Sequence, residues 1–188
     1  METTYQVERL DEGGFVHRGA HAGLENPARG DSANIGFIIG ETCVTVVDAG
    51  GSINTGRNLL RAVREKTSLP ICYVINTHVH FDHVLGNAAF VAEDPIFVGH
   101  ENLAAAMAGN KTFFVEQFAT ELAGGGEDLI IEPSLLVKTE QTIDLGERQL
   151  VLRPSKPAHP AANITAYDAK SNLMWAGELV FRESLTSL

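Results

Sequence analysis

Three histidines and one aspartate lie within the short segment THVHFDH, directly after an apolar run. His78, His80 and His83 offer imidazole nitrogens, and Asp82 offers a carboxylate. Neutral imidazole is a common zinc ligand because it needs little deprotonation near pH 7, and a carboxylate offsets part of the ion's charge. The segment therefore predicts a metal site; a solvated, histidine-rich loop is the structural alternative.

The apolar run Ile71–Ile75 predicts a buried strand that delivers this cluster. Side chains alternate along extended backbone, so His78 and His80 are expected to point to one side and to share one metal. Asp82 and His83 follow where the chain turns into a predicted helix. Neighbouring residues on a turn project in different directions, which makes this pair available to a second metal.

The motif THxHxDHxxGN after a strand, with a distant histidine and a Gly-acid pair, resembles that of the metallo-β-lactamase fold hydrolases, which use HxHxDH for two zinc ions. Within that superfamily, the pieces ANIGFIIGE, VINTHVHFDHVLGN, VGHENL and ITAYD are most similar to the zinc metallohydrolases associated with quinoprotein relay and sulfur-oxidation systems. The resemblance runs from about Val7 to Phe181. It implies an α/β fold of the αββα sandwich type, incomplete at the C-terminal end.

The resemblance also assigns later residues to the site. His159 takes the place of the third histidine on the first zinc, beside His78 and His80. Glu178 stands where the superfamily usually has an aspartate that bridges the two metals, and its extra methylene alters the metal spacing or occupancy. In the second site it would join Asp82 and His83.

Two departures from the family pattern change the predicted site, one in the loop after the third histidine and one in the ligands of the second metal. Pro160 replaces the threonine that commonly follows the third histidine, and no histidine follows His159, although the superfamily's last ligand lies beyond the equivalent of Glu178. The second site is then one ligand short. The sequence is a truncated form, or a partner chain supplies the missing part, or the second ion binds weakly or not at all.

The expected chemistry follows from the metal, since no GxSxG nucleophile motif is present. Zinc on three histidines leaves an open position, where bound water has a pKa near about 7 and yields hydroxide. Asp82 is the predicted base that orients this nucleophile. The predicted enzyme hydrolyses an ester, thioester, lactone or amide such as a β-lactam. The alternatives are a catalytically impaired metal-binding or partner-binding module and an iron-holding redox version of the same fold.

Four further residues are candidates around the site. Asp48 ends a strand beside the cluster and is a candidate acceptor that fixes the tautomer of a ligating histidine; the alternative is a turn-forming role. His17 and His21 lie in a segment that the resembling subfamily shares, at the pocket mouth or on the surface. Asn163 follows the third histidine and is a pocket candidate.

Strands that lead into helices are expected to position these residues, with a β-rich end. The predicted strands are Tyr5–Leu10, Gly14–Arg18, Asn34–Ile39, Thr42–Val47, Ile71–Ile75, Ile96–Val98, Leu135–Val137, Thr142–Ile143, Gln149–Leu152, Ile164–Tyr167 and Leu173–Ala176. The predicted helices are one capped by Ser52, then Val84–Phe90, Glu101–Met107 and Thr112–Leu122.

The composition bounds the class of protein. With 188 residues, 44% of them hydrophobic, the chain is long enough for a single domain over residues 1–188. A formal charge of −10 argues against a nucleic-acid partner and leaves a small-molecule substrate. No apolar run is long enough for a membrane helix. A shortened sandwich would expose an apolar face, so a homodimer or aggregation is expected.

Cys43 and Cys72 lie in β-branched apolar runs and are expected to pack as small apolar residues, with a disulfide left open. Met1 to Leu10 lacks the basic start and apolar core of a signal peptide. A removed leader would leave the same kind of start, so a periplasmic and a cytoplasmic location both stay open.

Overall fold

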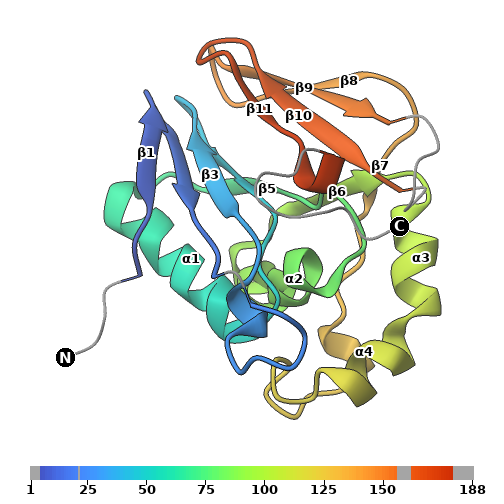
Figure 1. Ribbon diagram of the computed structural model, residues 1–188. Helices are drawn as coiled ribbons and strands as arrows, with labels where there is room; N and C mark the ends of the chain where they lie inside the picture. Colours follow the sequence, from blue (N-terminus) through green and yellow to red (C-terminus); the bar gives the residue numbers. More distant parts are fainter. Residues whose placement is uncertain (1–4, 21, 156–161, 180–188) are drawn as a thin grey trace.

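The computed structural model describes residues 5–20, 22–155 and 162–179. Two stacked β-sheets form the centre of the molecule, and Figure 1 shows helices α1 to α4 on the side of the larger sheet. This α/β sandwich confirms the predicted fold class. The strands of the larger sheet are β1 (Glu8–Asp11), β2 (Gly14–His17), β3 (Ile35–Ile39), β4 (Val44–Val47), β5 (Ile71–Ile75), β6 (Ile96–His100) and β7 (Leu135–Val137). Those of the smaller sheet are β8 (Gln141–Asp144), β9 (Gln149–Pro154), β10 (Ile164–Asp168) and β11 (Leu173–Trp175).

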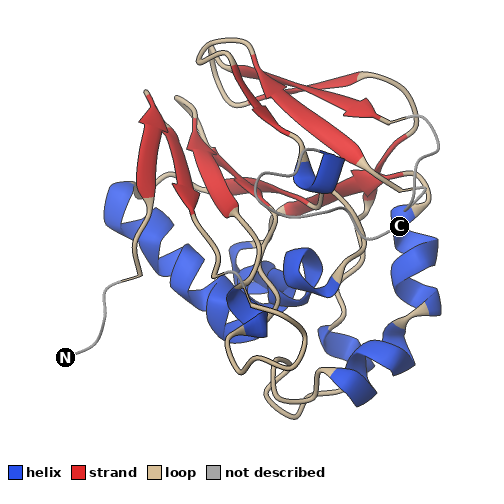
Figure 2. Ribbon diagram, viewed as in Figure 1, coloured by secondary structure: helices blue, strands red, loops and turns tan. Residues whose placement is uncertain are grey.

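Among the described helices, all except η4, which follows β11, lie in connections between strands of the larger sheet (Figure 2). The α-helices are α1 (Ile53–Lys66), α2 (Phe81–Val84), α3 (Leu103–Gly109) and α4 (Lys111–Gln117). The 3-10 helices are η1 (Arg29–Asp31), η2 (Leu85–Glu93), η3 (Glu127–Leu129) and η4 (Gly177–Leu179). The predicted Ser52 cap is confirmed, because the Ser52 hydroxyl accepts a hydrogen bond of 3.0 Å from the Thr55 backbone N–H.

Strand direction in the larger sheet decides where a site can form. Strands β1 to β4 pair antiparallel, whereas β4, β5, β6 and β7 pair parallel. The carboxyl ends of parallel strands meet at one edge, where the polar segments after them come together. Asp48 follows β4 and the HVHFDH segment follows β5, so this edge collects the predicted metal ligands.

Alternating side chains of the larger sheet fill two apolar layers. Val46 packs in the layer that includes Leu59 and Val63 of α1, while its neighbour Val47 packs between the two sheets. The layer between the sheets contains Ile75 and Val98 from the larger sheet and Ile143, Leu150, Leu152 and Ile164 from the smaller one. The central strands are therefore buried on both faces, which explains their continuous apolar runs.

The predicted helix Val84–Phe90 is wrong in type and start. The chain forms α2 at Phe81–Val84 and then winds as the 3-10 helix η2. The Gly86 backbone N–H donates to the Gly50 carbonyl at 2.8 Å, and a Cβ on Gly86 would lie 2.0 Å from the Ala49 carbonyl oxygen. This close contact between segments replaces the regular helical hydrogen bonds.

The expectation of two unpaired, packed cysteines is also wrong, because Cys43 and Cys72 form a disulfide. The parallel register of β4 and β5 places Val44 opposite Ile71, and the two cysteine Cα atoms lie 5.8 Å apart. The bond joins the starts of the two strands whose far ends carry Asp48 and the histidine segment.

Among the described residues, no helix has the length and apolar character needed to cross a membrane.

A buried ion pair ties the smaller sheet to the first hairpin. Arg148 donates to Asp168 through Nε at 3.1 Å and, through Nη1, to the Glu12 and Ile39 carbonyls at 2.7 and 3.0 Å. Burial alone would raise the pKa of Asp168, but the hydrogen bonds from Arg148 and Ser171 lower it below its usual value. The carboxylate is therefore ionised and satisfied inside the protein.

Replacing Arg148 by Ala should lower the free energy of unfolding by about 3 kcal/mol, because it leaves Asp168 buried without its partner. Because the folded-state pKa of Asp168 is lowered, its ionised form stabilises the fold above the carboxyl's unfolded pKa of about 3.9. This stabilisation is lost as pH falls through the folded pKa. In urea denaturation, the difference in free energy of unfolding between the wild-type protein and Arg148→Ala should accordingly become smaller in acid. An equal loss in the double variant Arg148→Met/Asp168→Leu would contradict this account.

Candidate metal centre

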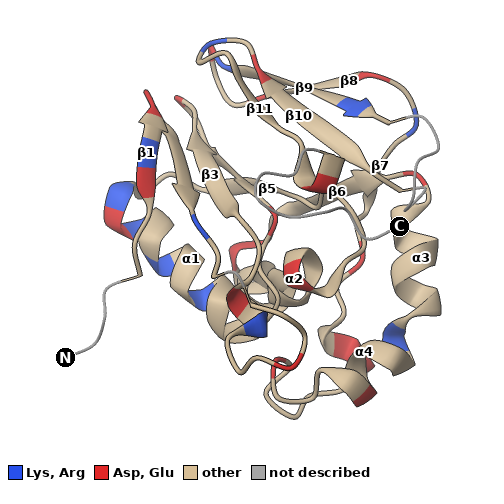
Figure 3. Ribbon diagram, viewed as in Figure 1, with Lys and Arg blue, Asp and Glu red and all other residues tan. Residues whose placement is uncertain are grey.

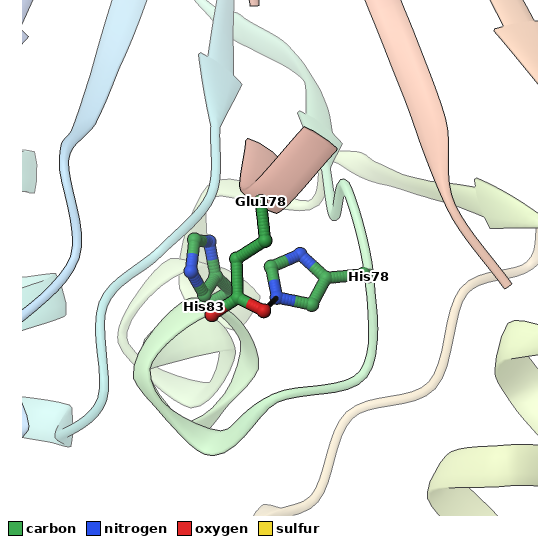
Figure 4. A group of neighbouring side chains, drawn as sticks. All are labelled: His78, His83 and Glu178. Carbon is green, nitrogen blue, oxygen red and sulfur yellow. Dashed lines mark ion pairs between the residues drawn. The ribbon is translucent and has the colours of Figure 1, made fainter. Parts of the chain in front are cut away.

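Residues from two separate segments, one after β5 and one in η4, converge at the edge where β4 and β5 end. Each of His78, His83 and Glu178 offers one ligand atom, and these atoms all lie within 4.8 Å of one another. Figure 4 shows the two imidazoles from the segment after β5 facing the Glu178 carboxylate, which reaches down from η4. A carboxylate and imidazole nitrogens at this spacing suit a divalent transition metal.

A chain of hydrogen bonds fixes the tautomer of His78. The Thr77 backbone N–H and hydroxyl donate to the two Asp48 carboxylate oxygens, each at 2.8 Å. Because the single hydroxyl proton of Thr77 points at Asp48, the contact of 2.9 Å between Thr77 Oγ1 and His78 Nδ1 requires the imidazole N–H to donate. The Nε2 lone pair of His78 is thereby left facing the interior of the site.

The same carboxylate orients His83. His83 Nδ1 lies 2.8 Å from Asp48 Oδ2, and a carboxylate accepts only, so Nδ1 carries the proton. Nε2 then faces the site, at 3.8 Å from Asp82 Oδ2. Asp48 thus makes the contact that a tautomer-fixing role requires, with both histidines oriented from one buried group.

Glu178 lies between two of the histidines. Its Oε2 is 2.7 Å from His80 Nδ1 and 3.4 Å from His78 Nε2. Burial would raise the pKa of Glu178, but the adjacent imidazoles of His78 and His80 hold it well below its usual range. The side chain is therefore an ionised carboxylate aimed at the imidazoles.

Close backbone contact between η4 and Thr77 places this carboxylate. Gly177 has a φ of +54°, and a Cβ there would lie 2.7 Å from Thr77 Oγ1. Glycine avoids the strain of that conformation and also the steric clash. A residue without a side chain is therefore what allows Glu178 to approach the histidines.

Asp82 reaches the site from the first turn of α2. The Ser32 hydroxyl lies within hydrogen-bond distance of Asp82 Oδ2, at 3.2 Å, and also 2.8 Å from the Arg29 carbonyl. Ser32 can therefore donate to the carboxylate and steady it at the cavity wall. The loop before β3 in this way takes part in holding the candidate base.

Two buried amides hold the histidine segment against η2. The Asn76 side-chain amide donates to Asn87 Oδ1 at 3.0 Å and to the His83 carbonyl at 3.3 Å. In return, the Asn87 amide donates to Asn76 Oδ1 at 2.8 Å and to the Ile131 carbonyl at 3.0 Å. This pair explains why an asparagine at each end of the segment accompanies the histidines.

The electrostatics of the cluster call for a positive charge. Burial favours neutral His83, yet the carboxylates of Asp48, Asp82 and Glu178 raise its pKa to about 9. Burial and the adjacent His83 lower the pKa of His78, which is fully buried. A proton on His83 offsets part of the negative charge of the three carboxylates. A divalent cation at the same place would offset this charge instead.

The residues present therefore fit a metal. Within the part of the chain that the structure describes, His78 Nε2 is buried and has no hydrogen-bond partner. Leaving such a nitrogen unpaired is costly, and a cation between the imidazoles and Glu178 would satisfy it. His78, His80, Asp82, His83 and Glu178 all contribute to this neighbourhood, so the structure brings these predicted residues together.

The other predicted site residues lie elsewhere or outside the described residues. His159 and His21 belong to the latter group. His17 lines a separate cavity, where Nε2 lies 2.8 Å from Asp31 and the ring stacks on Tyr5. Asn163 is buried next to β10, and its carbonyl accepts from the Ser155 backbone N–H at 3.0 Å.

Sequence reasoning missed several residues that shape the site. The sequence pattern includes Thr77 only as part of the motif and predicts no role for Ser32 or Gly177. Their contacts join segments far apart in the chain, so local spacing carries no signal for Ser32. The signal for Thr77 and Gly177 was their adjacency to His78 and Glu178, since a residue beside a ligand is well placed to orient it.

A two-sheet sandwich with histidines and carboxylates gathered at strand ends defines an α/β class of protein with a candidate metal centre. Residues 28–188 match the model of the Metallo-beta-lactamase superfamily, and the chain belongs to this superfamily. Its members are generally hydrolases and typically bind metal, often zinc. The finer resemblance to the quinoprotein relay and sulfur-oxidation subgroup stays a prediction.

Similar proteins include the acyl-coenzyme A thioesterase MBLAC2 of Bos taurus, 25% identical over 174 residues that cover 83% of this chain and 61% of that protein. The chain thus spans about three fifths of the length of this relative. A linear primary-alkylsulfatase of Pseudomonas sp. (strain ATCC 19151) is 37% identical over 54 residues, 29% of this chain and 10% of that protein. A solved metallo-beta-lactamase from Pontibacter korlensis aligns with a TM-score of 0.64 at 17% identity, over 88% of this chain and 67% of that one.

Replacing Asp48 by Asn should weaken zinc binding by about 10- to 100-fold, because an NH2 donor would replace one of the two oxygens that accept from Thr77 and His83. Asparagine tolerates the positive φ of position 48, so the backbone is retained. Competition with a chromophoric chelator measures the affinity. The matched control is Asp94→Asn, at another aspartate with positive φ, and equal affinities in the two variants would refute the role of Asp48.

Replacing Gly177 by Ala should also weaken zinc binding, since the added Cβ forces η4 and Glu178 away from Thr77. The same chelator titration measures the change. Gly109→Ala is the control, because a Cβ there has no atom within 4 Å. If Gly177→Ala binds zinc as tightly as Gly109→Ala, then Glu178 takes no part in the site.

Proposed function

We propose that this protein is a zinc-dependent hydrolase that cleaves a thioester or ester. The proposal rests above all on His78 Nε2, a buried imidazole nitrogen that has no hydrogen-bond partner among the described residues and lies 3.4 Å from Glu178 Oε2. His78, His80, His83, Asp82 and Glu178 would hold the metal, and His159 is the proposed further ligand. The superfamily membership supports hydrolysis as the reaction class.

When bound, zinc would lower the pKa of water and polarise the substrate carbonyl. The chain's own residues would do the rest. Asp82 would accept a hydrogen bond from the attacking water and take its proton, with Ser32 keeping the carboxylate in place. Asp48 and Thr77 would keep the imidazoles in their ligating tautomers. Addition of water across the thioester carbon–sulfur bond yields a carboxylic acid and a thiol.

The choice of a thioester is supported by the named activity of one relative. MBLAC2 is an acyl-coenzyme A thioesterase, and it matches most of this chain at 25% identity. Because this chain covers only 61% of that relative, its substrate comes here as a proposal only. An ester shares the carbonyl chemistry and stays within the proposed class.

Hydrolysis of the hexanoyl thioester of N-acetylcysteamine tests this function, with the released thiol followed by a thiol reagent. The chain's two cysteines are both in the disulfide, so the protein itself adds no thiol signal. We expect turnover after zinc loading, none after chelator treatment, and none in His78→Ala. His17→Ala, which removes a histidine from the separate cavity, is expected to retain activity.

Full activity in the chelator-treated protein or in His78→Ala would overturn the proposal. Tight zinc binding without turnover on ester, thioester, lactone and amide substrates would instead support a catalytically impaired metal-binding module.

A further inference from the structure

An open cavity of about 920 Å³ lies beside the candidate metal centre. Its volume is in the range of about 300–1,000 Å³ that is usual for small-molecule sites. One wall carries His80, Asp82, His83 and Glu178. The cavity also has an aromatic wall, made of apolar side chains that take no part in the metal chemistry: Val79, Phe81, Phe113, Phe114 and Phe118.

The aromatic wall is buried at Phe118 and exposed to solvent at Phe113. Phe81 stacks on Phe118 with ring centroids 4.2 Å apart, and the Phe113 ring meets Phe118 edge-on at 6.0 Å. Phe118 is only 4% exposed, whereas Phe113 is 54% exposed. A large ring left half in water at a cavity rim, on a packed aromatic base, offers contact area to an apolar ligand.

The cavity offers little to an anionic group. The described residues that line it include no Lys or Arg, but they include the acidic residues Asp82 and Glu178. Figure 3 shows these acidic positions on α2 and η4. The nearby Arg29 packs against the Phe118 ring at 4.9 Å and is paired with Glu121 at 2.7 and 3.1 Å.

We propose that this cavity selects substrates with an uncharged, apolar alkyl or aryl group next to the scissile bond. The aromatic wall would bind that group, and a carboxylate near the bond would meet Asp82 and Glu178 with no Lys or Arg among the described lining residues to pair with. The inference rests on the proposed hydrolase function and narrows it: medium-chain acyl thioesters and esters are taken, whereas ω-carboxyacyl thioesters and β-lactams, which carry a carboxylate close to the amide, are disfavoured.

The test compares thioesters of N-acetylcysteamine that differ only in the acyl group. The hexanoyl thioester should exceed the acetyl one in kcat/KM by about tenfold or more. The 5-carboxypentanoyl thioester has the same chain length with a terminal carboxylate, and it should be slower than hexanoyl by about tenfold or more. A parallel series of alkyl acetates distinguishes an apolar group on the alcohol side from one on the acyl side.

Phe113 is the residue to substitute, because it is 54% exposed and contributes little to the buried core. Phe113→Ala should reduce the hexanoyl-to-acetyl ratio of kcat/KM by about three- to tenfold, because it removes apolar contact area for the longer chain. Phe113→Lys should raise the relative rate on the 5-carboxypentanoyl thioester. Val91→Ala is the matched control, since Val91 is 49% exposed on η2 and lies away from the cavity.

A binding measurement separates this inference from the hydrolase proposal. The neutral dye N-phenyl-1-naphthylamine should bind the chain without added metal and brighten, and Phe113→Ala should weaken that binding while Val91→Ala does not. Dye binding that depends on Phe113, in a protein without turnover, supports the apolar binding role of the cavity and contradicts the proposed hydrolase function. Turnover with equal rates on acetyl, hexanoyl and 5-carboxypentanoyl thioesters, or dye binding that ignores Phe113, overturns the inference and leaves the function standing.

Discussion

The carboxylate of Asp48 is the group on which the rest of the site depends. It accepts hydrogen bonds from the Thr77 backbone, the Thr77 hydroxyl and His83, each at 2.8 Å. Through Thr77 it also fixes the tautomer of His78. One buried acceptor at the end of β4 thus decides which nitrogen of two imidazoles faces the site, and their lone pairs converge on Glu178 as a consequence.

The site also lies where the two sheets are joined. The Thr77 carbonyl accepts from the Ile164 backbone N–H at 2.9 Å, which links the end of β5 to β10 of the smaller sheet. Gly177, after β11, packs directly on the Thr77 side chain. Distortion of the layer between the sheets would therefore move Glu178 relative to His78 and His83. The apolar packing and the candidate chemistry are coupled through Thr77.

The elements that local pattern dictates were predictable, and the ones set by contacts between distant segments were not. The apolar run Ile71–Ile75 and the cap at Ser52 have local physical causes, and the structure has both. The Cys43–Cys72 bond depends on the parallel register of two strands 29 residues apart, and the winding of η2 depends on contact with another segment. The aromatic wall around Phe113 likewise forms only when α2 and α4 meet. The convergence of the HxHxDH side chains with Glu178 was expected from the family resemblance; its control by Thr77 was not.

X-ray absorption at the zinc edge tests the central claim most directly. The account predicts that the reloaded chain holds zinc with nitrogen and oxygen neighbours at about 2.0–2.2 Å and shows the outer-shell scattering of several imidazoles. Asp48→Asn should reduce that imidazole scattering, because His83 no longer presents the required nitrogen. Zinc that is absent after dialysis, or that is surrounded by oxygen alone, would contradict the account.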